Sequence, residues 1–324
     1  MRKIKIKNIN LSILQPLVAL FLMVIVMTIL SDKFATTDNL FNVARQISVN
    51  LCISIGMTLV ILTGGIDLSV GSILAFSGAI AAGLLKNGIS IETFNLFIGF
   101  TLFGSILFAL LVGACLGFFN GIMITRFKVP PFVATLAMLT IARGFTMLYT
   151  NGFPITQLGK NFTFIGTGWI LGIPMPVIIS FFLIIIFAFF LSKTPKGRYI
   201  YAIGGNERAA LLSGINVNKI KLLVYTLAGL LAAVGGILVT ARLDSSQPNA
   251  GLGYELDSIA AVVIGGASLN GGKGSIFGTV IGAIIIGILN NGLVLLNVSP
   301  FWQQVIKGFV ILLAVIIDKL QRKD

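Results

Sequence analysis

The chain has 324 residues, of which 56% are hydrophobic and 10% are charged, and its mean hydropathy is +1.03. Soluble domains carry about 25% charged residues, so this composition excludes an ordinary soluble fold and indicates a polytopic membrane protein. The net charge is +13, but the basic residues are scattered over loops without interleaved aromatic residues, which favours positive-inside topology over a nucleic-acid partner.

The first apolar segment covers residues 11–30 and follows a basic N-terminus, MRKIKIKNIN. It lacks the short apolar core and small-residue exit of a signal peptide, so we predict an uncleaved span that enters from the cytoplasm. Residues 150–168 are predicted to form an outward polar loop. Further spans are predicted at 40–62, at a third segment ending near 85, and at 94–117, 132–149, 169–191, 222–241, 276–296 and 301–317.

A glycine-rich stretch, TGGIDLSVGS at residues 63–72, separates the second and third spans. Broken backbone at membrane depth is tolerated where protein or a water-filled cavity satisfies it, and a carboxylate such as Asp67 is costly in hydrocarbon. Two interpretations remain open: Asp67 caps the third helix, or it lines the inner mouth of a pathway.

Arg126 and Lys128 mark a cytoplasmic loop before the predicted fifth span, and Arg143 lies within that span. An arginine at membrane depth faces the bundle interior or snorkels to an interface. We therefore expect Arg143 to be either a structural ion-pair partner or a polar lining residue.

The longest polar interruption is the loop at residues 193–221, which contains six Lys or Arg residues and a single acid, Glu207. This charge bias places the loop in the cytoplasm. It predicts a short helix, because Asn206 can cap the first turn, Glu207 suits the positive end of the helix dipole and Gly214 suits a left-handed stop. The helix interior, residues 209–212, is too short and too apolar to be stable alone in water. It therefore needs a groove, either on its own bundle or on a partner.

Residues 243–275 form a second broken stretch, in which Asp257 precedes an apolar run, 259–264, that is short for a full crossing. We expect a short or unwound helix that lines a cavity at a bundle interface. Lys273 does not fit a phosphate-binding loop, because Ala267 stands at the first glycine position and Gly274 follows the lysine in place of Ser or Thr. Nucleotide binding by this chain is therefore not expected.

Together these segments predict an all-α fold: one polytopic transmembrane helical bundle, residues 1–324, with about ten spanning helices, some discontinuous, and both termini cytoplasmic. The sequence contains no histidine, and Cys52 and Cys115 lie in apolar segments, where a cysteine is usually a small core residue. Its sparse acids form no paired carboxylates with evident spacing. We therefore expect neither an enzyme nor a metal or cofactor in this chain.

The pattern Glu207-x-Ala209-Ala210-x-x-x-Gly214 resembles the permease signature of ATP-binding-cassette (ABC) importers, from which it departs by the insertion of Arg208. The adjoining text, GRYIYAIGGNE and SGINVNKIKLLVY, is similar to the ribose-type monosaccharide permeases. So are ARGFTMLYTNGFP and GYELDSIAAVVIGGASLNGGKG. The resemblance covers nearly the whole chain, apart from the N-terminal tail and the loops near residues 86 and 163.

This resemblance implies the membrane permease subunit of a bacterial inner (plasma) membrane importer for a monosaccharide. D-ribose is favoured, while xylose, arabinose, galactose and an autoinducer stay open. The family acts as a homodimer with a cytoplasmic ATPase of two fused nucleotide-binding halves, which binds ATP and Mg²⁺. A periplasmic or lipid-anchored sugar-binding protein completes the system, and transport proceeds by alternating access.

Two groups of candidate residues follow from the resemblance and the polar pattern. Coupling to the ATPase is assigned to the short helix and its ends: Asn206, Glu207, Arg208, Ala209, Ala210, Leu211, Leu212, Ser213 and Gly214. The candidates for lining the pathway or a cavity are Asp67, Asn120, Arg143, Asp257, Asn290 and Asn291, with helix packing as the alternative role of the asparagines. The alternative function is a sugar facilitator or an ion-coupled secondary transporter, which would use the charged residues in its spans.

Overall fold

The computed structural model describes residues 11–91 and 96–320. Their fold is all-α, as the composition predicts, with three minor pairs of antiparallel strands. The helices are α1 (Leu11–Leu30), α2 (Thr37–Leu62), α3 (Val70–Asn87), α4 (Leu102–Thr125), α5 (Pro131–Thr150), α6 (Lys160–Thr167), α7 (Met175–Lys193), α8 (Pro195–Gly205), α9 (Glu207–Leu212), α10 (Val217–Leu243), α11 (Tyr254–Ile264), α12 (Ile276–Leu295) and α13 (Pro300–Leu320). The strand pairs are β1 (Ile89–Ile91) with β2 (Leu96–Ile98), β3 (Ile155–Thr156) with β6 (Ser245–Ser246), and β4 (Trp169–Ile170) with β5 (Ile173–Pro174).

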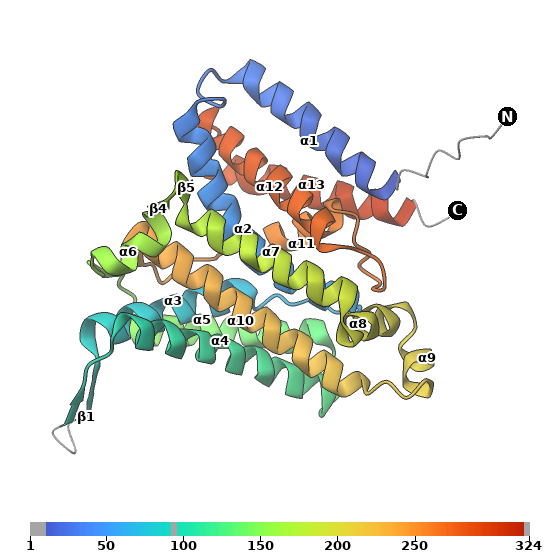
Figure 1. Ribbon diagram of the computed structural model, residues 1–324, viewed down its shortest axis with the longest axis horizontal. Helices are drawn as coiled ribbons and strands as arrows, with labels where there is room; N and C mark the ends of the chain where they lie inside the picture. Colours follow the sequence, from blue (N-terminus) through green and yellow to red (C-terminus); the bar gives the residue numbers. More distant parts are fainter. Residues whose placement is uncertain (1–10, 92–95, 321–324) are drawn as a thin grey trace.

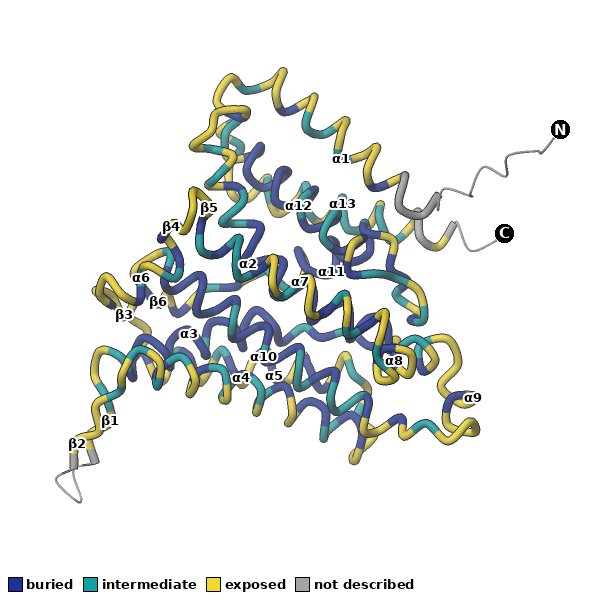
Figure 2. Tube along the Cα trace, in the orientation of Figure 1, coloured by how far each residue is buried: buried dark blue, intermediate teal, exposed yellow. Residues whose placement is uncertain are grey.

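Helix α10 runs through the middle of the bundle (Figure 1). It packs most extensively on α4 and also contacts α2 and α3. The burial colouring shows α10 and α2 mostly dark blue, whereas α1 and the outer faces of α4 and α7 carry exposed residues (Figure 2). The exposed side chains on those faces are largely apolar, which suits helices that face lipid rather than water.

Glycines allow the backbones of α4 and α10 to touch. Gly113 and Gly117 of α4 lie directly against Gly229 of α10, where a Cβ on any of the three would meet the backbone of the facing helix. Small residues at an interface are the usual means by which membrane helices approach closely. All three glycines lie in predicted spans, and the structure brings them into contact across two helices.

Seven helices among the described residues are long and apolar enough to cross a membrane, namely α2, α3, α4, α5, α7, α10 and α12. Helices α1 and α13 contribute shorter apolar segments, Gln15–Leu30 and Pro300–Ile316, and α11 has only 11 residues. The chain is therefore a polytopic bundle, with one predicted short helix confirmed as α11. The predicted positions of the two termini fall on residues 1–10 and 321–324, outside the described part of the chain.

Three predicted segments near the predicted outer surface differ from the structure. The sixth span, predicted at residues 169–191, begins only with α7, because the residues before it form the β4–β5 pair. The fourth span was predicted at residues 94–117, but the helix is α4, Leu102–Thr125, and the residues before it form strand β2, which pairs with β1 through Ile89↔Ile98. Residues 94 and 95 lie outside the described residues. An apolar run was mistaken for the start of a helix although it pairs as a hairpin. The predicted outward loop at residues 150–168 also contains a helix, α6.

The two ends of the bundle differ in structure. Helices α8 and α9 lie at one end, and the β1–β2 hairpin, strands β4 and β5, and α6 lie at the other (Figure 1). The loop between α2 and α3 belongs to the α8 end, because the Gly272 N–H donates to the Leu62 carbonyl, and Gly204 of α8 packs against both groups. This end is the one that the charge pattern assigns to the cytoplasm.

Candidate functional site

Helix α9 has the ends that its sequence predicts. The Asn206 side chain accepts a hydrogen bond from the Ala209 N–H at 2.9 Å, and Glu207 occupies the first turn. Gly214 has φ +81°, the left-handed conformation that favours glycine, and its N–H donates to the Leu211 carbonyl at 3.0 Å. The short helix and both of its ends are therefore confirmed, while its role remains a prediction.

The apolar side chains of α9 divide between the bundle and the surface. Ala210 is 4% exposed and packs in the core, whereas Leu211 is 60% and Leu212 is 82% exposed. Packing on its own bundle therefore accounts for only part of the apolar surface of this helix. Two exposed leucines on a single-turn helix form a small apolar surface at the end of the bundle, suited to a partner groove.

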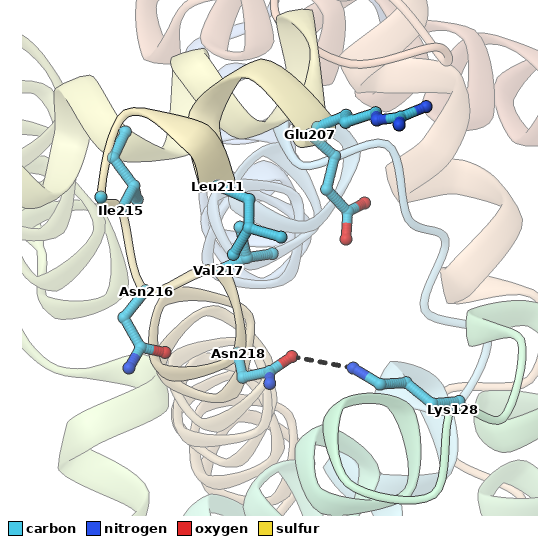
Figure 3. A pocket seen from close by; sticks show the side chains of 9 residues that line it. Lys128, Glu207, Leu211, Ile215, Asn216, Val217 and Asn218 are labelled. Atoms are coloured by element: carbon cyan, nitrogen blue, oxygen red, sulfur yellow. Dashed lines mark hydrogen bonds between the residues drawn. The ribbon is translucent and has the colours of Figure 1, made fainter.

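A cleft of about 770 Å³ lies beside α9 (Figure 3). It is lined by residues from four segments: the α4–α5 loop, α9, the α9–α10 loop, and the start of α10. Lys128 Nζ donates to Asn218 Oδ1 at 3.1 Å, which ties the α4–α5 loop to α10. The lining residues are Lys128, Glu207, Arg208, Leu211, Gly214, Ile215, Asn216, Val217 and Asn218.

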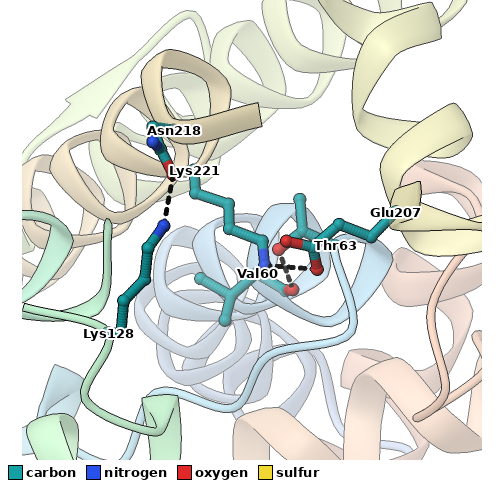
Figure 4. A network of polar contacts seen from close by, with 6 residues as sticks. All are labelled: Val60, Thr63, Lys128, Glu207, Asn218 and Lys221. Carbon is teal, nitrogen blue, oxygen red and sulfur yellow. Dashed lines mark hydrogen bonds and ion pairs between the residues drawn. The ribbon is translucent and has the colours of Figure 1, made fainter. Parts of the chain in front are cut away.

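A salt bridge anchors α9 to α10 (Figure 4). Lys221 Nζ lies 2.7 Å from Glu207 Oε2, and the Glu207 side chain is 56% exposed, so this pair contributes only about 0.5 kcal/mol. Lys128 and Arg208 at the same cleft have no ion-pair partner within the described residues. The mouth of the cleft therefore carries a surplus of positive charge, which suits an acidic partner surface.

Helix α8 connects this surface to the two broken stretches. Tyr201 Oη donates to the Gly274 carbonyl at 2.9 Å, and burial raises the pKa of the Tyr201 phenol, which keeps this donor protonated. Together with the Gly204 contacts to Leu62 and Gly272, this bond joins α8 to the α2–α3 loop and the α11–α12 loop. Helix α8 is therefore in direct contact with both broken stretches and is joined to α9 through Asn206.

Asp67 lies in a fully buried polar cluster at the same end. Its Oδ1 accepts from the Ser69 N–H at 2.9 Å and from Ser69 Oγ at 2.6 Å, and Asn120 Nδ2 donates to Ser69 Oγ at 2.9 Å. Asp67 Oδ2, Asn120 Oδ1 and Tyr225 Oη are buried and have no hydrogen-bond partner among the residues that the structure describes. The structure thus unites Asp67 with Asn120. Asp67 accepts hydrogen bonds from Ser69, the residue just before α3, so its contact is similar to the expected helix cap. The pathway interpretation stays a prediction.

Substitution of Asp67 tests its local structural role. Asp67→Asn keeps an acceptor oxygen for Ser69 and is expected to lower stability by less than about 1 kcal/mol, whereas Asp67→Leu leaves the Ser69 N–H unpaired and should cost about 2 kcal/mol. Thermal unfolding of the purified variants in one detergent measures the difference. A stability of Asp67→Leu equal to that of the unsubstituted protein would refute the local structural role.

The other pathway candidates fall into separate contacts. Asp257 of α11 accepts from Asn290 of α12 at 3.1 Å and pairs with Lys307 of α13, also at 3.1 Å. Asn291 points to the other side of α12 and exchanges hydrogen bonds with Asn39 of α2, at 2.9 and 3.0 Å. The six candidates therefore do not converge on one site.

Arg143 stabilises a segment that has no regular structure. Its Nη1 donates to the Pro248 carbonyl at 2.6 Å and to the Ala250 carbonyl at 2.9 Å, and the Glu255 carboxylate lies close enough to interact electrostatically. Arg143 forms no ion pair within the described residues, so its structural contacts are with backbone carbonyls and not with an acid, while its role as a polar lining residue stays a prediction. The sequence analysis did not identify Tyr201 of α8 or Lys128 of the cleft as site residues. The only sequence signal for either was that Lys128 lies in a predicted cytoplasmic loop.

These features define a polytopic membrane protein of the transporter type, with interrupted helices inside and an exposed apolar helix at one end. The chain belongs to the family described as branched-chain amino acid transport system / permease component, whose profile matches residues 39–315. It is a multi-pass protein of the bacterial inner (plasma) membrane, in a transport family rather than a catalytic one.

Individual relatives match over most of both chains. The ribose import permease protein of Bacillus subtilis (strain 168) is 51% identical over 308 residues, 94% of this chain and 92% of the relative. The D-allose transport system permease protein of Escherichia coli (strain K12) is 38% identical, over 90% of this chain and 86% of the relative. The xylose transport system permease protein of Haemophilus influenzae is 35% identical, over 98% of this chain and 99% of the relative. No solved structure was found to match.

Proposed function

We propose that this chain is the permease subunit of an ABC importer that carries a monosaccharide, D-ribose, into the cytoplasm. The relatives with about half of their residues identical to this chain are ribose import permeases, whereas the xylose and allose permeases are more distant. The observation that carries the proposal within this chain is α9, a capped helix on which Leu211 and Leu212 are largely exposed.

The proposal includes a partner ATPase and a binding protein. A cytoplasmic ATPase of two fused nucleotide-binding halves, loaded with ATP and Mg²⁺, receives α9 in an acidic groove, and the loop at residues 193–221 acts as the coupling loop. A periplasmic or lipid-anchored sugar-binding protein delivers the sugar at the opposite end. Two copies of the chain form the permease, which works by alternating access.

In this arrangement residues 1–324 form a single transmembrane permease domain that crosses the membrane about ten times. The seven long apolar helices supply seven crossings, and α1, α11 and α13 supply the rest, with α11 as the discontinuous one. Both termini are then cytoplasmic. The excess of Lys and Arg at the α8 end supports this orientation.

Leu212→Asp tests the proposed docking of α9. Leu212 is 82% exposed, so the substitution leaves the bundle intact, but it puts a charge into a desolvated contact, where the loss of one apolar anchor costs about 2 kcal/mol. In liposomes with the cognate ATPase and binding protein, ribose uptake and binding-protein-stimulated ATP hydrolysis should both fall at least about tenfold.

Leu212→Met is the matched control, since it keeps an apolar side chain of similar volume and should transport normally. Normal uptake by Leu212→Asp would disprove docking through α9. Ribose flux through the unsubstituted protein without ATP would instead identify a facilitator or an ion-coupled carrier.

A further inference from the structure

The segment between α10 and α11, residues 244–253, returns into the membrane. Helices α3 and α10 run parallel, with Leu74 level with Gly236 and Gly78 level with Thr240. By this register Gly71 lies at the height of Ala233 in α10. Ala233 is about ten residues from the outer end of α10, which corresponds to ~15 Å along the helix axis. Because the backbone of Gly251 lies directly against Gly71, the chain descends toward the middle of a hydrocarbon layer about 30 Å thick.

Arg143 gives an independent measure of this depth. It lies about two turns inside the outer end of α5, and it donates to the Pro248 and Ala250 carbonyls. Gly251 and Gly253 have φ +72° and +80°, a conformation that glycine adopts without strain. The segment is therefore a fixed, non-helical stretch of backbone at membrane depth.

Its side chains alternate between the core and an open face. Ser246, Pro248 and Gly251 are buried, whereas Gln247 and Asn249 are exposed. Gln247 Nε2 donates to Ser245 Oγ at 3.0 Å, and no hydrogen bond of the Asn249 side chain occurs within the described residues. Leu252 is 62% exposed and Leu256 is 48% exposed, so apolar side chains are also exposed close to these amides in the sequence.

The Asn249 side chain, which lies between the two carbonyls that Arg143 binds, cannot face lipid at this depth without a large cost, and irregular backbone is tolerated there only beside protein or a water-filled cavity. Amides offer both donors and acceptors to hydroxyl groups, and a neighbouring apolar surface suits the C–H face of a sugar ring. Uncharged amides also bind a neutral solute weakly enough for the solute to be released.

We propose that Asn249 and the neighbouring Gln247 form a sugar-contacting subsite in the outer half of the translocation pathway, with the exposed Leu252 as an apolar neighbour three residues further along the chain. This assignment rests on the proposed transport of a monosaccharide. It places the contacts with the moving sugar on residues other than Asp67, Asn120, Asp257, Asn290 and Asn291, whose side chains are buried in helix contacts.

Thiol labelling tests whether the segment faces water. Cys52 is buried but Cys115 is exposed, contrary to the core position expected for it, so the experiment starts from the Cys115→Ser variant of the full chain. Asn249→Cys and Gln247→Cys are treated with a charged methanethiosulfonate reagent in liposomes containing the complete transporter. Ile185→Cys is the control, because Ile185 is exposed midway along α7 on an apolar face. Labelling of the segment should be at least about tenfold faster, because thiolates form in water and not in lipid.

Transport of the sugar supplies the second readout. Asn249→Leu should lower ribose uptake about tenfold while binding-protein-stimulated ATP hydrolysis stays within about twofold of the unsubstituted protein, because the motor contact is untouched. Labelling no faster than at Ile185→Cys, as when a second copy covers the segment, would overturn the subsite, and so would rapid labelling with unchanged uptake by Asn249→Leu. Absence of ATP-dependent ribose uptake in the unsubstituted protein would overturn the proposed function instead.

Discussion

Gly229→Leu is expected to prevent stable folding of the bundle. A Cβ at Gly229 would lie 2.9 Å from the Gly117 Cα and N atoms and even closer to the Gly113 carbonyl oxygen. These are backbone atoms of α4, which cannot rotate away as a side chain could. Overpacking commonly costs about 1–3 kcal/mol, and a leucine that separates two helices along their whole contact should cost at least about 3 kcal/mol.

Gly144→Leu is the control for this substitution. Gly144 lies on α5, another long apolar helix, and a Cβ there would meet nothing within 4 Å. Size-exclusion profiles and thermal unfolding in the same detergent compare the two proteins. The packing argument fails if Gly229→Leu elutes and unfolds like Gly144→Leu.

Lys307→Met should strongly destabilise the α11–α12–α13 region. Lys307 pairs with Asp257, which is 3% exposed and also accepts from Asn290. Without the lysine, the carboxylate would remain in an apolar surrounding with a single neutral donor. Removing one partner of a buried ion pair costs about 3 kcal/mol, because the other charge is left uncompensated.

The double variant Lys307→Met with Asp257→Asn distinguishes an ion pair from simple loss of contacts. It contains no isolated charge, so it should recover most of the stability lost in Lys307→Met. Thermal unfolding of the single and double variants measures the interaction. A double variant less stable than Lys307→Met alone would show that the carboxylate has a role independent of the lysine.

Some parts of the site were predictable because their chemistry is local. The Asn206 cap and the left-handed Gly214 depend on residues within one helical turn, and both were read from the sequence. The β1–β2 hairpin was missed, because an apolar run has the same hydropathy whether it pairs as a strand or continues as a helix.

Other parts depend on which helices touch, and these were not predictable. Asn290 meets Asp257, whereas the neighbouring Asn291 meets Asn39, far away in sequence. Adjacent asparagines on a helix point in different directions, so their roles follow from the packing of α12 against α11 and α2. Arg143 likewise donates to backbone carbonyls, and no residue pattern predicts these acceptors.

The sequence by itself determined that this protein is a membrane bundle, where its apolar segments lie and which loop carries the capped helix, because hydropathy, charge bias and capping are properties of short stretches. Helix packing, in contrast, leaves the leucines of α9 exposed, pairs Asp257 with Lys307, and brings Gly251 against Gly71 with Asn249 exposed nearby. Exposure, partners and depth all depend on the register between helices distant in the chain, which glycine contacts and long-range packing set.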